Sequence, residues 1–376
     1  MSPRRRVVAW ADQTRHDEGP ENRGRDARVG CPFVASLEAR MTRVAIMGSG
    51  SWGTAFGMVL ADAGSDVTIW GRDPVAVRDI EENHRNEAYH PGIALPARLS
   101  ATTNPATALA GASLVVLAVP AQVLRANLGD WGEAIDPDAV LVSLMKGIEI
   151  GTSKRMSQVI MESAAVSADR VAVVSGPNLA REIAERQPAA TTVACIDEAS
   201  AQRLQNACTT DYFRPYWTTD VVGTEIGGAV KNVIAVANGM AAGMGLGENS
   251  QASLITRGLA EMARLGVALG ADPLTFQGLA GVGDLVATCQ SPLSRNRTFG
   301  FNLGQGLSVE QTIAATKQTC EAYKSCQPIL ELGRENGVDL PITEQVVEVL
   351  YRGRSPKTLA ASFMARNTKA EALLRE

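Results

Sequence analysis

The sequence predicts an α/β fold, with a mostly parallel sheet in the first part of the chain and an all-helical domain after it. Short, continuous apolar runs recur between residues 44 and 195, and segments with helical periodicity separate most of them. Buried parallel strands have this pattern because helices cover both faces of their sheet. Beyond about Asp220 the strand-like runs stop and longer helical stretches follow.

The expected elements can be given in chain order. Strands are expected over residues 44–47, 66–70, 113–119, 139–143, 171–174 and 191–195. Helices are expected over residues 51–63, 224–242, 251–269, 308–315 and 320–335. We therefore expect a sheet domain over residues 41–222 and a helical, substrate-binding domain over residues 223–376, with the site in the cleft between them.

The first forty residues differ in composition from the rest. They begin with a basic SPRRR segment and continue with a polar stretch that has little apolar periodicity. An export signal would need an apolar core of about 7–15 residues, and this segment has none. We expect residues 1–40 to be a disordered extension, or the result of a start codon placed ahead of Met41.

Composition and charge exclude several classes of protein. Over 376 residues the net charge is −4, which leaves no basic footprint for nucleic acid. The six cysteines form no CxxC pair, so we expect reduced thiols and a cytoplasmic protein. All three histidines lie in the first quarter of the chain, and no metal-ligand spacing occurs. The apolar stretch 227–247 contains Lys231, so we expect no membrane span.

A glycine-rich motif follows the first expected strand. Gly48, Gly50 and Gly53 match G-x-G-x-x-G, with Ser51 and Trp52 between the last two. In Rossmann-like domains the first glycine permits a tight turn, the second lets a pyrophosphate approach the backbone, and the third lets helix and strand pack closely. The following helix presents free N–H groups and the positive end of its dipole. Because a strand precedes the motif and a helix follows it, we interpret it as a dinucleotide site; an ordinary glycine-rich turn is the alternative.

The residue after the second expected strand indicates whether the adenosine ribose of the cofactor has a 2′-hydroxyl or a 2′-phosphate. A site specific for NAD has an acidic side chain about 20 residues after the glycines, which accepts from the 2′-hydroxyl. This chain has Arg72 there, 19 residues after Gly53, and Asp73 follows it. Because a guanidinium can pair with a 2′-phosphate and stack on adenine, we predict that NADPH is preferred and that NADH is also accepted. A solvated surface arginine is the alternative.

A dehydrogenase acting on a ketone needs a proton donor beside the site of hydride transfer. No histidine follows His90, so lysine is the expected donor. Lys231 lies in a helix of small residues, where it either acts in a cleft or extends its amine to solvent. Lys146 follows the strand that ends near Ser143, at the sheet edge where ligands bind, unless it is an ordinary loop lysine. Asp284 follows a glycine-rich turn and either orients Lys231 or caps a helix.

A compact group of donors occurs in an expected loop before Phe299. Ser294, Arg295 and Asn296 supply a hydroxyl, a guanidinium and an amide. This combination suits a phosphate monoester, and an exposed basic turn is the alternative. The pattern therefore predicts a phosphorylated substrate.

Together these motifs resemble the bacterial NAD(P)-dependent glycerol-3-phosphate dehydrogenases. The likeness extends from about Arg43 to about Glu348 and includes VAIMGSGSWGTAFG, WGRD, NEAYHPGIALP, VVLAVPAQ, LMKGIE, VSGPNLAREIA, GGAVKNVIAVANGMAAG, GVGDLVATC and SRNRTFG. The resemblance implies reversible reduction of dihydroxyacetone phosphate to sn-glycerol 3-phosphate with NADPH or NADH, for phospholipid biosynthesis. It also implies a homodimer.

The resemblance further implies roles for individual residues. Lys231 would be the proton donor and acceptor, and Lys146 would contact both cofactor and substrate. The other implied substrate contacts are Gly176, Asn178, Asp284, Ser294, Arg295 and Asn296. The implied cofactor contacts, beyond Lys146 and the three glycines of the motif, are Ser51, Trp52, Arg72, Ala180, Arg295, Thr319 and Glu321. The chain departs from the family pattern in two places. Asn178 replaces the usual Ser or Thr, and around Glu321 the usual glycine after the acid is Ala322, while Thr319 and Cys320 replace more apolar residues.

Two other functions stay open from the sequence alone. Related dehydrogenases with a Rossmann-like and a helical domain act on 6-phosphogluconate or ketopantoate and also use a lysine, so a substrate profile separates them. A cofactor-binding sensor would bind NADPH without turnover and would lack an active-site residue. Both lysines and Asp284 are present here, which disfavours the sensor.

Overall fold

The computed structural model describes residues 42–316 and 320–358. The predicted extension over residues 1–40 and the predicted cofactor contact Thr319 lie outside these described residues. Within them, no helix is long and apolar enough to cross a membrane.

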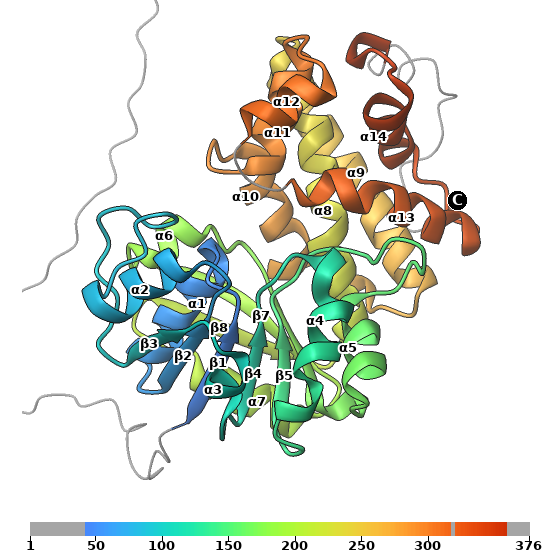
Figure 1. The fold of residues 1–376 in the computed structure, drawn as a ribbon. Helices are drawn as coiled ribbons and strands as arrows, with labels where there is room; N and C mark the ends of the chain where they lie inside the picture. Colours follow the sequence, from blue (N-terminus) through green and yellow to red (C-terminus); the bar gives the residue numbers. More distant parts are fainter. Residues whose placement is uncertain (1–41, 317–319, 359–376) are drawn as a thin grey trace, which may run out of the picture. The chain divides into compact units, whose positions relative to one another are not determined.

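In residues 42–316 and 320–358, eight strands form a single sheet in the order β3-β2-β1-β4-β5-β6-β7-β8 (Figure 1). The strands are β1 (Arg43–Met47), β2 (Asp66–Trp70), β3 (Leu99–Thr102), β4 (Leu114–Leu117), β5 (Val140–Ser143), β6 (Val171–Ser175), β7 (Ala189–Cys195) and β8 (Phe213–Thr218). The first six are mutually parallel. β7 is antiparallel to β6, and β8 is parallel to β7, so the last two strands run the opposite way.

Among the residues that the structure describes, seven α-helices accompany the strands. They are α1 (Ser51–Asp62), α2 (Pro74–Asn83), α3 (Pro105–Leu109), α4 (Leu124–Trp131), α5 (Met156–Ala164), α6 (Ala180–Ala184) and α7 (Glu198–Ala207). On β1, Val44 and Ile46 pack in a cluster with side chains of α1, α6 and α7, whereas Ala45 and Met47 pack with α3, α4 and α5. Because both faces of the sheet are covered, successive strand residues are apolar rather than alternating.

The chain after β8 is helical. Its helices are α8 (Val221–Gly243), α9 (Glu248–Ala268), α10 (Asp284–Gln290), α11 (Arg295–Gly304), α12 (Val309–Ala315), α13 (Glu321–Glu335) and α14 (Pro341–Arg352). Short helical turns are η1 (Ala121–Val123), η2 (Gly132–Ala134), η3 (Ala168–Arg170), η4 (Pro273–Gln277) and η5 (Leu279–Gly283). Figure 1 shows α8 among α9, α10, α11 and α13.

Helix α8 is buried along almost its whole length, which explains its composition. A Cβ on Gly239 would stand 2.1 Å from the carbonyl oxygen of Arg297, and one on Gly243 would stand 2.2 Å from that of Phe301. Only glycine lets α8 and α11 approach this closely. A helix that is apolar on all sides belongs in a core, so its few polar residues need an explanation of their own.

The α/β class, the mostly parallel sheet and the helical second part are confirmed. Two strands, β3 and β8, were not expected. β8 contains Pro215 and the exposed Tyr216 and Trp217, a pattern that fits an edge strand rather than a buried one. The division into domains at residue 222 stays a prediction, although α8 begins at Val221, directly after β8.

Candidate active site

The strand order reverses at β1, which pairs with β2 on one side and β4 on the other. In open α/β sheets, ligands bind outside the carboxyl ends of the strands at such a point. The glycine-rich turn begins there, where the backbone N–H of Gly48 donates to the carbonyl oxygens of Ile46 and Trp70. Gly48 has a φ of +135°, and a Cβ on it would stand 2.5 Å from the carbonyl oxygen of Ala118. This position therefore requires glycine.

The other two glycines of the turn have different surroundings. A Cβ on Gly53 would stand 2.3 Å from the carbonyl oxygen of Gly48, so this glycine lets α1 pack against the turn. No atom lies within 4 Å of where a Cβ on Gly50 would stand. Gly50 is the N-cap of α1 and provides no side-chain cap. The first N–H groups of α1 therefore face open space at the end of β1.

A loop that the sequence analysis did not assign holds this turn in place. The Nδ2 of Asn86 donates to the carbonyl oxygen of Ser49 at 3.0 Å. The Nε2 of His90 lies 2.8 Å from the carbonyl oxygen of Ser51 and must donate to it. Burial lowers the pKa of His90, so its ring is neutral near pH 7. Asn86 and His90 belong to the motif NEAYHPGIALP, and only the folded structure shows that both side chains are buried against the turn.

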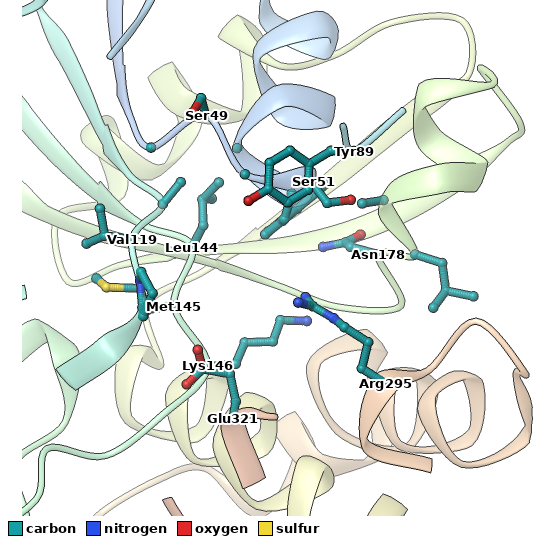
Figure 2. A pocket seen from close by; sticks show the side chains of 18 of the residues that line it. Ser49, Ser51, Tyr89, Val119, Leu144, Met145, Lys146, Asn178, Arg295 and Glu321 are labelled. Atoms are coloured by element: carbon teal, nitrogen blue, oxygen red, sulfur yellow. The ribbon is translucent and has the colours of Figure 1, made fainter. Parts of the chain in front are cut away.

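A cavity of about 640 Å³ opens at the carboxyl ends of β1, β4 and β5 (Figure 2). Its other side is lined by the middle of α8, by Thr288 of α10 and by the start of α11. Most of the residues predicted for the site line it: Gly48, Gly50, Ser51, Trp52, Gly53, Arg72, Lys146, Asn178, Ala180, Lys231, Ser294, Arg295, Asn296 and Glu321. Gly176 and Asp284 do not line it but contact Lys146, which does. The fold thus gathers residues that are up to 273 positions apart, from Gly48 to Glu321, around one cavity.

One carboxylate joins the two lysines. The Nζ of Lys231 donates to Oδ1 of Asp284 at 2.6 Å, and the Nζ of Lys146 donates to Oδ2 at 2.6 Å. The side chains are 8%, 14% and 2% exposed for Lys231, Lys146 and Asp284. Lys231 therefore does not extend to solvent, and Lys146 is not an ordinary loop lysine. Asp284 is the first residue of α10 rather than its cap, which is Gly283.

Each lysine has one further partner in the protein. Lys231 Nζ donates to Oγ1 of Thr288 at 2.7 Å, and Lys146 Nζ donates to the carbonyl oxygen of Gly176 at 3.0 Å. An ammonium group has three N–H donors. Each lysine thus uses two donors on protein partners and keeps one for a ligand in the cavity.

Burial and charge act against each other in this cluster. Burial lowers the pKa of Lys146 to about 8; the Asp284 carboxylate opposes this shift and the nearby Lys231 ammonium adds to it. Burial alone would raise the pKa of Asp284, but Lys146 and Lys231 together hold it below its usual value. Two ammoniums and one carboxylate leave a net positive charge at one end of the cavity, which suits an anionic ligand.

A row of amides connects α8 to α11. The Nδ2 of Asn232 donates to the carbonyl oxygen of Lys146 at 3.1 Å, and the Nδ2 of Asn296 donates to Oδ1 of Asn232 at 2.8 Å. Oδ1 of Asn296 in turn accepts from the backbone N–H of Ala322 and from the Cys320 thiol. Asn232 and Thr288 were missed from the sequence, because only the packing of α8 on α10 and α11 brings them to Lys146 and Lys231.

The group predicted as a loop before Phe299 is instead the start of a helix. Ser294 is the N-cap of α11, and its Oγ accepts from the backbone N–H of Arg297 at 3.3 Å. This helix start places the Arg295 side chain in the cavity, where Figure 2 shows it extending toward Lys146. The expectation of a loop was wrong because serine is common both in turns and at the N-cap of helices, and Ser294 is an N-cap.

Three further predicted contacts lie along the cavity wall. Asn178 donates from Nδ2 to Oγ1 of Thr191 at 2.8 Å. Ala180 begins the short helix α6 beside it. Glu321 begins α13, and burial raises the pKa of its carboxyl even though Arg295 opposes this shift.

Arg72 and Asp73, which follow the end of β2, have different surroundings. Arg72 is exposed and lines the cavity. Asp73, which follows it, accepts a hydrogen bond from the backbone N–H of Val75 at 2.9 Å and caps α2. The acid next to Arg72 thus has a structural partner, whereas Arg72 is available to a ligand.

Comparison with known proteins shows which family this chain belongs to. The family model described as the N-terminus of NAD-dependent glycerol-3-phosphate dehydrogenase matches residues 43–201, and the model of the C-terminus matches residues 220–361. This chain belongs to the NAD-dependent glycerol-3-phosphate dehydrogenase family. The first model covers β1 to β7 with the glycine turn, and the second covers the helices that carry Lys231, Asp284 and Arg295.

Individual members of the glycerol-3-phosphate dehydrogenase family are close to this chain. A glycerol-3-phosphate dehydrogenase [NAD(P)+] of Streptomyces griseus is 61% identical over 88% of this chain and 98% of that protein. One of Thermobifida fusca is 60% identical over 88% of this chain and 99% of that protein. The solved structure of glycerol-3-phosphate dehydrogenase from Coxiella burnetii is 33% identical, covers 86% of this chain and 98% of its own, and has a TM-score of 0.82.

Proposed function

We propose that this chain catalyses the reversible reduction of dihydroxyacetone phosphate to sn-glycerol 3-phosphate with NADPH or NADH. The observation that carries the proposal is the bridge from Lys146 through Asp284 to Lys231, set at the end of the cavity into which the glycine turn opens. The bridge supplies positive charge and proton donors where a carbonyl would meet the cofactor. Family membership supplies the substrate class.

The residues of the glycine turn fit a dinucleotide. The space beside Gly50 is open, and the uncapped start of α1 offers N–H groups to a diphosphate. Arg72 lines the same cavity just after β2, which supports a contact with a 2′-phosphate and a preference for NADPH. When bound, the cofactor supplies the hydride.

Lys231 then acts on the carbonyl oxygen at C2 of the substrate. Its one remaining N–H donates a hydrogen bond that polarises the C=O bond, and its proton passes to that oxygen as hydride reaches the carbon. Asp284 holds the ammonium in place and stabilises its charge. The proton is regained from solvent, so the reaction consumes one hydride and one proton for each ketone.

The remaining residues hold the substrate phosphate and carbon chain. We infer that Arg295, Asn296 and Ser294 at the start of α11 bind the phosphate, since a guanidinium pairs with phosphate oxygens through two N–H donors. Lys146 contacts cofactor and substrate from the other side. Asn178 completes the substrate contacts, and Ala180 and Glu321 complete those of the cofactor. Gly176 does not line the cavity, so we infer that it acts by accepting a hydrogen bond from Lys146. Thr319 is proposed on the resemblance alone.

A substrate profile tests this proposal. With dihydroxyacetone phosphate the purified protein should oxidise NADPH or NADH, and with ketopantoate or 6-phosphogluconate the rate should stay at background. Turnover of ketopantoate without turnover of the triose phosphate would contradict the proposal. Binding of NADPH without turnover of any ketone would instead favour the sensor.

The cofactor preference depends on Arg72. Replacing Arg72 with alanine should raise the KM for NADPH by about tenfold, the loss of one charge-assisted contact, and leave the KM for NADH unchanged. Steady-state kinetics with both cofactors measures the two values. Equal effects on both cofactors would mean that Arg72 does not contact a 2′-phosphate.

The pH dependence of the free protein depends on Lys146. Since burial lowers the pKa of Lys146 to about 8, this group is charged below that pH and neutral above it. The kcat/KM for dihydroxyacetone phosphate should therefore fall as pH rises through about 8, by up to about tenfold per pH unit. A Lys146→Arg variant stays charged and should lose this inflection, even if its kcat/KM is lower throughout. The same inflection in both proteins would assign it to another group.

Two glycines of the turn should respond differently to alanine. Gly50→Ala should fold with an unchanged Tm, because its Cβ meets no protein atom, yet it should bind NADH more weakly, because that Cβ occupies the cofactor's space. Gly48→Ala should lose about 1–3 kcal/mol of stability from its positive φ, with a further cost from the contact with Ala118. Thermal unfolding and NADH titration of both variants measure this. A Gly50→Ala protein with full NADH affinity would contradict the proposed position of the diphosphate.

Three predictions from the sequence remain proposals. The homodimer, the cytoplasmic location and the supply of glycerol 3-phosphate to phospholipid biosynthesis come from the sequence and its resemblance to the family. Gel filtration with light scattering tests the first, since a dimer elutes at twice the mass of the chain.

A further inference from the structure

Arg181 is a cation of the cavity wall that no step of the proposed function uses. It is the second residue of α6 and lines the cavity together with Ser51, Trp52 and Tyr89. Its side chain is 38% exposed, so it can reach a ligand without unfolding any part of the protein.

The position of Arg181 relative to the glycine turn follows from a chain of contacts. Its Nη1 donates to the carbonyl oxygen of Pro91 at 2.8 Å. Pro91 follows His90, whose Nε2 lies 2.8 Å from the carbonyl oxygen of Ser51, the first residue of α1. The Arg181 charge also helps to lower the pKa of the His90 ring. The guanidinium is therefore beside the start of α1.

Three donors of Arg181 remain available. A guanidinium has five N–H groups, of which one is used on Pro91 and one, from Nε, on Oε1 of Glu185 at 2.6 Å. The Glu185 pair is exposed on both sides, at 38% and 37%, and such surface pairs contribute little. An anion near Ser51 can thus take up the three remaining N–H groups while the bond to Pro91 persists.

We propose that Arg181 is a cofactor-binding residue that pairs with the diphosphate of the dinucleotide across the start of α1. The inference rests on the proposed function for the presence of a dinucleotide. The start of α1 supplies N–H groups and only a partial positive charge, whereas a diphosphate carries two full negative charges. His90 is neutral and adds none. Arg181 supplies the missing cation, and it acts on NADH and NADPH alike.

The test measures binding without turnover. Titration of the full chain with ADP-ribose, NADH and NADPH, followed by calorimetry, should show about tenfold weaker binding of all three by Arg181→Ala, as expected for one charge-assisted contact. The salt dependence of each Kd should also decrease, since one ion pair is lost. Arg181→Lys keeps the charge and should retain part of the affinity. Arg203→Ala, which removes an exposed arginine of α7 outside the cavity, should change nothing.

The outcomes separate this inference from the proposed function. Unchanged Kd values in Arg181→Ala would overturn it, and so would weaker binding with an unchanged salt dependence, because that result assigns Arg181 only to holding Pro91. Loss of affinity for NADPH alone would assign the cation to the 2′-phosphate and also overturn it. A wild-type protein that binds neither ADP-ribose nor NADH would contradict the proposed function itself. If Arg181→Ala does not fold, the salt dependence and affinity of Arg181→Lys decide.

Discussion

Replacing Lys231 with methionine should lower kcat for dihydroxyacetone phosphate by about 10²- to 10⁴-fold, the usual contribution of a positioned proton donor. Methionine has a similar length and no proton to donate. The variant should fold normally, because Asp284 keeps Lys146 as its counter-charge and the buried cluster becomes neutral overall. The Kd for NADH should change little, since the contacts at Gly48, Gly50 and Ser51 are intact.

A matched control is available for this experiment. Lys154 is half-exposed and pairs with Glu162 on the surface, so Lys154→Met removes a lysine outside the cavity. Its kcat should equal that of the wild type. If the Lys231→Met protein is folded, binds NADH and keeps its full kcat, the proton comes from another group and the role proposed for Lys231 is wrong.

Replacing Asp284 with asparagine should destabilise the protein by about 3–5 kcal/mol at pH 7, the cost of leaving buried charges without their partner. The change keeps the shape of the side chain and removes only its charge. Two ammoniums, from Lys146 and Lys231, would then be buried together without a carboxylate. Activity should fall as well, because neither ammonium is held in position. Chemical denaturation measures the loss of stability.

The loss of stability in Asp284→Asn, relative to the wild type, should become smaller as pH rises. Without the carboxylate, the pKa of Lys146 falls below its value of about 8, while in the unfolded chain it is near 10.4. Above its lowered pKa the native variant has released this proton and the unfolded chain still holds it, so the stability of the variant rises with pH. The wild type gains in the same way only above about 8, so the deficit narrows between the lowered pKa of the variant and about pH 8. Asp66→Asn, which breaks an exposed pair with Arg98, should cost less than about 1 kcal/mol at every pH. A deficit in Asp284→Asn that is small or independent of pH would mean that the two lysines are not held by this carboxylate.

The sequence alone predicts those parts of the fold that depend on neighbouring residues, such as the glycine turn and the buried strands. The glycine turn could be predicted because Gly48 and Gly53 occupy positions where the backbone leaves no room for a Cβ. The buried strands could be predicted because both faces of the sheet are covered. β8 was missed because its neighbours on β7 stabilise it, although its own sequence, with Pro215 and exposed aromatics, favours an edge or a loop. The reversal of β7 has no local signal either.

In the candidate site, too, some residues could be identified from the sequence, whereas their contacts with each other could not. Lys231 stood out because a charge in a helix of small residues needs a partner, and Asp284 was a reasonable one. That Asp284 also binds Lys146 could not be inferred, because the two are 138 residues apart and meet only in the folded protein. Thr288 and Asn232 are ordinary polar residues in sequence, and only their contacts with the two lysines mark them.

The most direct test of the account follows the hydride itself. NADPH labelled with deuterium at the transferred position of C4 is incubated with the protein and dihydroxyacetone phosphate, and the product is analysed by mass spectrometry. The account predicts sn-glycerol 3-phosphate with one deuterium at C2, in an amount equal to the cofactor oxidised, and a rate lowered by about 10² or more in Lys231→Met. Oxidation of the cofactor without deuterium at C2, or no glycerol 3-phosphate at all, would contradict it.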